Sequence, residues 1–176
     1  MAGTNHPLKR LVTMAADDVA AWLFDGPVRQ VTTRPGTFPP PSDELDSDLV
    51  FFVTLANGRE VILHLECQGP GTDRPMPIRM LDYQTRLAVI YPKLPVYSVV
   101  WYVGSGVGAR DEGMHERADL DDQTYLAWRY RVIRLWQLDG AALLALNRPA
   151  LLALIGQTRL CDPKPILSQA VRQIME

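Results

Sequence analysis

Residues 48–68 read DLVFFVTLANGREVILHLECQ, and this stretch carries the strongest structural signal in the chain. The pair Asn57-Gly58 stands between two runs of apolar and β-branched residues, a pattern typical of a tight β-hairpin. We therefore predict a strand over residues 48–56, a two-residue turn, and a returning strand over residues 59–68. Gly69-Pro70-Gly71 then ends the second strand.

The open end of this hairpin gathers oxygen-bearing side chains. Side chains alternate along a strand, so Glu66 and Gln68 share one face. The predicted turn pairs Ala56 with Arg59, and counting outward brings Asp48 beside Glu66 and Gln68. Two carboxylates in a partly buried site repel each other unless a cation lies between them. Oxygen ligands with room for water suit Mg²⁺ or Mn²⁺, although each carboxylate alone also fits the polar end of a strand.

The segments around the hairpin predict a mixed α/β domain. Apolar residues recur at helical spacing in the first segment, and Pro75 and Pro77 introduce a second helix. The order of the elements predicts helices packed on a mixed sheet, in a single domain over residues 1–176 with its core at about 8–138. We expect helices over 9–24, 77–91, 140–147 and 163–176, further strands over 28–33, 96–104 and 124–138, and an acidic solvated loop over 104–122.

Length and composition exclude several classes of protein. With 176 residues, 47% of them hydrophobic and 22% charged, the chain is neither disordered nor fibrous. No apolar run approaches the roughly 18 residues of a membrane span, and no apolar segment of a signal peptide follows the N-terminal charges. With Cys67 and Cys161 as the two cysteines, we expect reduced thiols and a cytoplasmic protein. The formal net charge of −2 means that nucleic-acid binding needs a local basic patch.

Three pieces of sequence in fixed order resemble a nuclease superfamily. They are Asp48-Leu49-Val50, Leu65-Glu66-Cys67-Gln68 and Met76-Pro77-Ile78-Arg79-Met80-Leu81-Asp82-Tyr83. An acidic residue, then Glu-x-Gln, then Met-Pro-x-Arg-x-x-x-Tyr resembles the PD-(D/E)XK nucleases, and more narrowly their Rpn/YhgA-like branch of transposase-like, recombination-promoting nucleases. The similarity covers roughly residues 11–138, and residues 130–136 resemble a late strand of that group.

The resemblance implies a restriction-endonuclease-like α/β/α core and a metal-dependent DNA endonuclease. It implies that Asp48 and Glu66 hold Mg²⁺ or Mn²⁺ and that the backbone carbonyl of Cys67 is a further ligand. Gln68 stands where the superfamily usually has Lys; it carries no charge, so water activation would depend on the metal. The resemblance also implies that Arg79 holds a substrate phosphate, the alternative being an ion pair with Glu66.

Tyr83 lies four residues after Arg79 on the same helical face, and the resemblance implies that it orders the substrate site. A homodimer is compatible with the nuclease hypothesis. Gln68 and the acidic net charge favour an alternative, in which a catalytically inactive nuclease fold binds DNA or another protein.

Other polar residues have two interpretations each. His64 either lines the site or is a buried sheet histidine, and acidic residues at 17 and 18 either join the metal or face solvent. Asp73 and Arg74, before the second helix, are candidate substrate contacts. Arginines 129, 131 and 134 interleave with aromatic residues, as in a nucleic-acid-binding patch or on the outer face of a strand.

Overall fold

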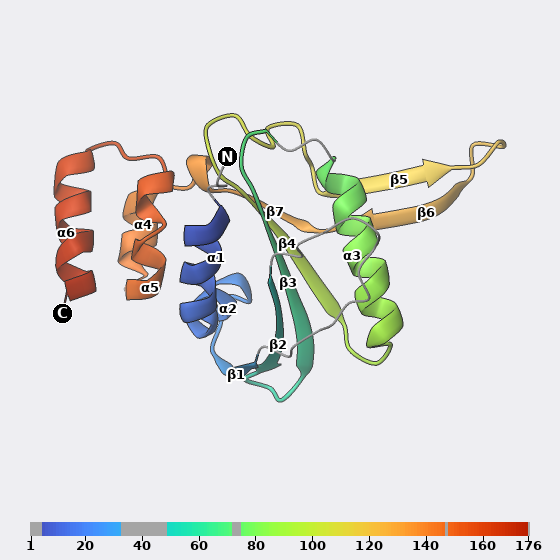
Figure 1. Ribbon diagram of the computed structural model, residues 1–176, viewed down its shortest axis with the longest axis horizontal. Helices are drawn as coiled ribbons and strands as arrows, with labels where there is room; N and C mark the ends of the chain where they lie inside the picture. The colour runs from blue at the N-terminus through green and yellow to red at the C-terminus, as the bar shows by residue number, and fades with distance from the viewer. Residues whose placement is uncertain (1–4, 33–48, 72–74, 147, 176) are drawn as a thin grey trace.

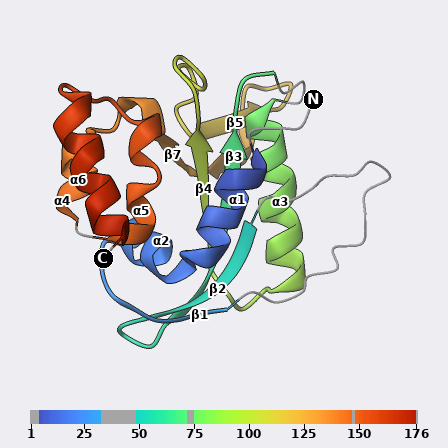
Figure 2. The same cartoon turned by 60° about the vertical axis from the view of Figure 1, so that its left-hand side comes forward.

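The computed structural model describes residues 5–32, 49–71, 75–146 and 148–175. A five-stranded sheet lies between helices on both faces, so the chain has the predicted mixed α/β architecture (Figure 1, Figure 2). In chain order the elements are α1 (Asn5–Met14), α2 (Ala16–Leu23), β1 (Val28–Thr32), β2 (Leu49–Leu55), β3 (Glu60–Gln68), α3 (Met76–Ile90), β4 (Val96–Tyr102), β5 (Met114–Ala118), β6 (Thr124–Arg129), β7 (Arg131–Arg134), α4 (Gly140–Ala145), α5 (Pro149–Leu152) and α6 (Pro163–Met175), with 3₁₀ turns at Leu135–Gln137 and Ile155–Gln157.

The main sheet has the order β1-β2-β3-β4-β7. β1, β2 and β3 are antiparallel neighbours, whereas β3, β4 and β7 run parallel to one another. Helix α3 covers one face, and α1, α2 and the C-terminal helices lie on the other (Figure 1). β5 and β6 form a separate antiparallel hairpin that projects from the body beside α3 (Figure 1).

Strand β3 is covered on both faces, which explains why its residues from Val61 to Gln68 are all buried. Leu63, Leu65 and Cys67 belong to the core cluster beneath the N- and C-terminal helices. Ile62 packs on the opposite face against α3. The predicted alternation is therefore confirmed, and we call the surface that carries the even-numbered residues of β3 the α3 face.

The hairpin loop between β2 and β3 has three residues, so the predicted pairing of Ala56 with Arg59 is wrong. The backbone N–H of Leu55 donates to the Arg59 carbonyl at 2.9 Å, and Leu49 pairs with Leu65. Gly58 has φ = +84°, a left-handed conformation that closes a three-residue loop without straining the strand twist. The register therefore differs from the prediction by one residue.

Two further boundaries differ from the predictions. The helix expected over 9–24 is two helices, because the backbone leaves the helical region at Ala15 (φ −115°, ψ 25°) and α2 turns to pack on the core. The strand expected over 124–138 divides at Tyr130 into β6 of the projecting hairpin and β7 of the main sheet. The predicted loop over 104–122 accordingly contains a strand, β5.

Asp139 caps the N-terminus of α4, since its carboxylate accepts a hydrogen bond from the Ala141 N–H at 3.0 Å. Helix α5 packs against α2, and α6 packs on α4 and α5. In the part of the chain that the structure describes, no helix has both the length and the apolar character needed to cross a bilayer.

Candidate functional site

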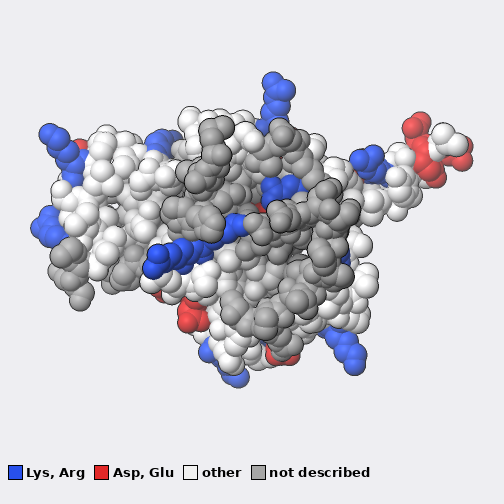
Figure 3. Space-filling model, in the orientation of Figure 1, with Lys and Arg blue, Asp and Glu red and all other residues white. Residues whose placement is uncertain are grey.

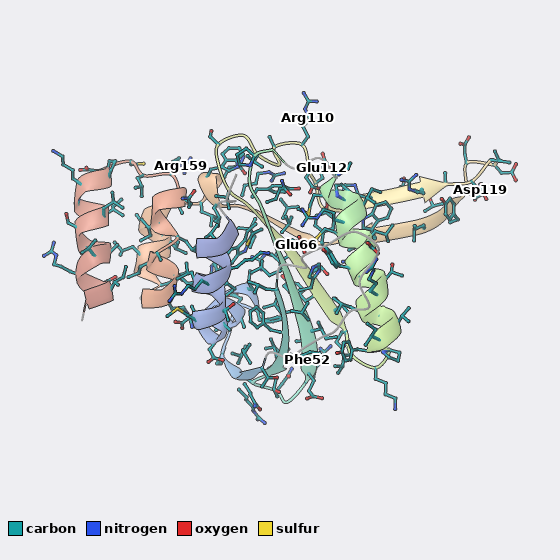
Figure 4. All side chains as sticks on the ribbon, viewed as in Figure 1. Phe52, Glu66, Arg110, Glu112, Asp119 and Arg159 are labelled. Carbon is teal, nitrogen blue, oxygen red and sulfur yellow. The ribbon has the colours of Figure 1, made fainter. Side chains whose placement is uncertain are left out.

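The carboxyl half of β3 places three polar side chains on the α3 face. His64 and Glu66 are fully buried, and Gln68 is 8% exposed. A buried carboxylate is costly unless charge and hydrogen bonds compensate it. The partners of Glu66 therefore define the chemistry of this site, which lies between the sheet and α3 (Figure 4).

Arg79, in the first turns of α3, joins two of these side chains. Its Nη2 donates to Glu66 Oε2 at 2.5 Å, and its Nη1 donates to Gln68 Oε1 at 3.0 Å. The planar fork of a guanidinium suits two acceptors side by side. Pro77 near the start of α3 favours a helix beginning here, which sets Arg79 over the end of β3. The ion-pair alternative for Arg79 is thus the arrangement in this structure.

His64 lies against the other oxygen of the same carboxylate. Its Nε2 is 3.4 Å from Glu66 Oε1, and its Nδ1 is 3.2 Å from the Oγ of Ser98 on β4. For a neutral imidazole this geometry assigns the proton to Nε2, with the Ser98 hydroxyl donating to Nδ1. Arg79 and His64 therefore fix both oxygens of Glu66. Sequence reasoning noticed His64 but did not predict this positioning, which depends on the neighbouring strand.

Tyr83 and Cys67 occupy different sides of β3. Tyr83 is buried one turn after Arg79, and its ring centroid lies 5.1 Å from that of His64. The side chain of Cys67 points into the opposite core. The Gln68 carbonyl accepts from Val103 N on the β4 side at 2.9 Å, so the alternating carbonyl of Cys67 faces the β2 side.

Other candidates lie apart from Glu66 or outside the described residues. Asp48, together with Asp73 and Arg74, falls outside them. Asp17 and Asp18 are on α2, on the side of the sheet away from α3 (Figure 1), and Asp18 pairs with Arg148 at 3.1 Å. The structure therefore does not bring the acidic residues of α2 to the site.

The described oxygen donors of the site are one carboxylate and one amide, and Arg79 donates to both. Side-chain oxygens of Glu66 and Gln68 converge on one positive group, the Arg79 guanidinium, and carboxylate and amide oxygens are ligands that Mg²⁺ accepts. Within the described residues no three His, Cys, Asp or Glu side chains form a metal-binding group. A metal site here accordingly needs a further ligand from the undescribed residues, from the backbone or from water.

A second buried hydrogen-bond network, centred on Asp111, lies next to the site. The sequence did not predict it, because Asp111 was expected in a solvated loop. Its carboxylate accepts hydrogen bonds from the hydroxyls of Tyr102 and Tyr130 and from the Gly113 N–H, and His115 Nε2 lies 3.2 Å away. We call these five residues the Asp111 network. Its members lie on three separate segments, so sequence spacing gave no signal for it.

The Asp111 network makes stability sensitive to alkaline pH. Burial raises the pKa of both Tyr102 and Tyr130 well above the ordinary value of 10.0, and hydrogen bonding to Asp111 and its negative charge raise the pKa further. Because the folded state binds these protons more tightly, their stabilisation is complete below about pH 10 and is lost as pH rises above that value.

We therefore expect the free energy of unfolding, measured by urea titration, to fall steeply above about pH 10. Tyr102→Phe should make that fall shallower, because it removes one of the two protons. Tyr125→Phe, at an exposed position on β6, is the matched control and should follow the wild type. Identical slopes for all three proteins would contradict the assignment.

No protein-family model, curated protein or solved structure matches the chain.

Proposed function

We propose that this chain is a metal-dependent DNA endonuclease of the PD-(D/E)XK type, in the Rpn/YhgA-like branch, that hydrolyses phosphodiester bonds. The observation that carries the proposal is the buried group of Glu66, Gln68 and Arg79 at the carboxyl end of β3. The mixed sheet between two helical layers is compatible with a restriction-endonuclease-like core. The ordered sequence motifs supply the family assignment.

The proposal gives each motif residue a role. Asp48 and Glu66 are the carboxylate ligands of Mg²⁺ or Mn²⁺, and the carbonyl of Cys67 is a further ligand. Asp48 directly precedes Leu49, whose partner across the hairpin is Leu65, the neighbour of Glu66. This adjacency in sequence and register supports the pairing of the two acidic residues in one site.

The side chains of the protein contribute to the proposed reaction by orienting the Glu66 carboxylate, the water and the phosphate. When bound, the divalent ion supplies an acidified water and stabilises charge on the phosphoryl group. Arg79 and His64 hold the Glu66 carboxylate in one orientation, which lowers the cost of organising the site. Gln68 orients water or a phosphate oxygen by hydrogen bonding alone. With substrate present, Arg79 shares its guanidinium between Glu66 and the phosphate, and Tyr83 packs beside His64.

One observation favours a second candidate, an inactive nuclease fold that binds DNA or protein. The Arg79 guanidinium already compensates the charge of Glu66, and Gln68 supplies no cation of its own. In that case the Arg79 guanidinium balances the charge of Glu66 in place of a metal ion. The two candidates differ in whether Mn²⁺ binds, because a ligand that binds only the folded state raises its stability.

Cleavage of supercoiled plasmid by the purified full chain tests the proposal. We expect nicking with Mg²⁺ or Mn²⁺, none with a chelator, and a loss on the order of 10²-fold in Asp48→Ala. Asp46→Ala, which removes a carboxylate two residues earlier, is the control and should retain activity. Inactivity of the wild type with every metal, together with no thermal stabilisation by Mn²⁺, would favour the binding module. Equal activity of Asp48→Ala and wild type would exclude Asp48 as a ligand.

A further inference from the structure

Arg79 contacts the same side-chain oxygens that a metal ion at this site would use. Its Nη2 donates to Glu66 Oε2 at 2.5 Å, and its Nη1 donates to Gln68 Oε1 at 3.0 Å. A divalent ion on these oxygens would lie close to the guanidinium, and two positive groups at short distance repel each other. In this orientation Arg79 therefore competes with a metal ion for Glu66.

The Arg79 side chain is incompletely paired. It is 11% exposed, and its Nε is buried without a hydrogen-bond partner among the described residues. A buried donor that lacks an acceptor costs free energy, so an acceptor that reaches Arg79 from outside would be favoured. A phosphodiester offers two charged oxygens, and arginine binds such groups through two N–H groups at once.

Other arginines of the chain are paired in a different way. Arg131 donates to the Leu23 carbonyl and Arg134 to the Gly108 carbonyl, each at 2.8 Å, and Arg134 uses its Nε for this bond. These two arginines hold the fold together, because their partners are backbone groups of distant segments. Arg79 instead contacts two side chains of the candidate site, and those contacts can exchange without a change in the fold.

The remainder of the surface has little charge with which to hold DNA. The formal net charge of the chain is −2. On the face that Figure 3 shows, the Lys and Arg side chains of the described residues are spread over several parts of the chain rather than gathered in one patch. Contacts to phosphates supply a large share of the affinity of proteins for DNA. DNA binding should therefore depend strongly on Arg79 and on the charge of a bound ion.

We propose that Arg79 is an exchangeable partner of Glu66 that couples metal binding to DNA binding, an inference that rests on the proposed function and concerns the regulation of its site. Without DNA, the guanidinium compensates the charge of Glu66 and disfavours the ion. A phosphodiester turns the guanidinium partly away from Glu66 and Gln68, and the oxygens that Arg79 releases become available to Mg²⁺ or Mn²⁺. Each ligand then raises the affinity of the other by the same factor.

The exchange keeps the Glu66 carboxylate compensated with and without substrate. A buried carboxylate without a positive partner is costly, and here the guanidinium or the ion supplies the positive charge. His64 Nε2 lies 3.4 Å from the other oxygen of Glu66 and continues to orient it. The exchange requires rotation about the side-chain bonds of Arg79, a type of change that is common at binding sites.

Mn²⁺ binding to the purified full chain, measured by electron paramagnetic resonance of the free ion, tests this inference without cleavage. Without DNA, we expect Arg79→Met to bind Mn²⁺ about tenfold more tightly than the wild type, because the competing positive charge is removed. Arg86→Met is the control, since Arg86 pairs with Asp82 on the same helix, and it should change the affinity less than twofold.

A second measurement uses the wild type alone and so does not depend on the folding of a variant. A short duplex, under conditions in which electrophoresis shows it intact, should tighten Mn²⁺ binding to the wild type by about tenfold. Ions bound by the duplex alone are subtracted. In folded Arg79→Met the duplex should leave the Mn²⁺ affinity unchanged.

Equal Mn²⁺ affinities of the wild type and folded Arg79→Met would overturn the inference, as would a wild-type affinity that DNA does not change. Absence of Mn²⁺ binding in every protein, with and without DNA, would refute both the exchange and the proposed metal site. Metal-dependent plasmid cleavage with a Mn²⁺ affinity independent of Arg79 would refute the exchange alone. Coupling of Mn²⁺ to DNA through Arg79, without cleavage, would support the exchange and refute the nuclease.

Discussion

Arg79→Ala is expected to lower the free energy of unfolding by about 3 kcal/mol or more, the usual cost of removing one partner from a buried ion pair. Glu66 is fully buried and the Arg79 side chain is 11% exposed, so solvent cannot replace the lost guanidinium well. Gln68 loses the donor to its Oε1 in the same variant. Urea denaturation at neutral pH, monitored by circular dichroism, measures the loss.

Two variants identify the cause of that loss. Arg86→Ala removes an arginine from a partly exposed i,i+4 pair with Asp82 on the same helix, and it should cost no more than about 0.5 kcal/mol. Adding Glu66→Gln to Arg79→Ala should recover much of the stability, because the buried negative charge is then gone. A double variant as unstable as Arg79→Ala would show that packing of the Arg79 side chain, rather than charge, determines the loss.

The sequence predicted the hairpin and its faces because those features are local. Alternation of side chains along β3 identified Glu66 and Gln68 as neighbours on one face. The predicted register of the two strands is wrong because the left-handed backbone of Gly58 adds one residue to the loop. Asn-Gly permits both two-residue and three-residue loops, so the dipeptide alone does not determine which residues pair.

The partners of the site residues were harder to predict, because they depend on how separate elements pack. From the sequence, Arg79 had two possible roles, one of which was an ion pair with Glu66. Which role it takes depends on how α3 is rotated about its axis over the sheet, and in the structure Arg79 faces Glu66. The link from His64 to Ser98 requires the parallel pairing of β3 with β4. The environment of Asp111 was also not predictable from the sequence. Its acidic neighbours indicated a solvated loop, but its carboxylate is buried among tyrosines.

The two networks meet on the α3 face. Tyr102 pairs with Gln68 across β3 and β4, and its hydroxyl donates to Asp111, which in turn contacts His115 of the hairpin. The Asp111 network therefore begins on the strand next to the one that carries Glu66 and Gln68.

Glu66→Gln is expected to reduce metal-dependent plasmid cleavage by roughly 10³-fold, at the upper end of the range for one electrostatic element of an active site. The substitution preserves size and removes the charge that the proposal assigns to the metal. It also releases Arg79 from its ion pair, so two parts of the site change together. Rates from nicked-product formation, at several Mg²⁺ and Mn²⁺ concentrations, measure the effect.

Glu60→Gln is the matched control, since Glu60 is an exposed glutamate at the opposite end of the same strand. It should retain wild-type cleavage and wild-type stabilisation by Mn²⁺. Loss of both cleavage and Mn²⁺ stabilisation in Glu66→Gln alone supports the metal role, because a stability defect by itself does not abolish metal linkage in the folded fraction. Wild-type Mn²⁺ stabilisation in Glu66→Gln would place the metal elsewhere and leave Glu66 as the structural partner of Arg79.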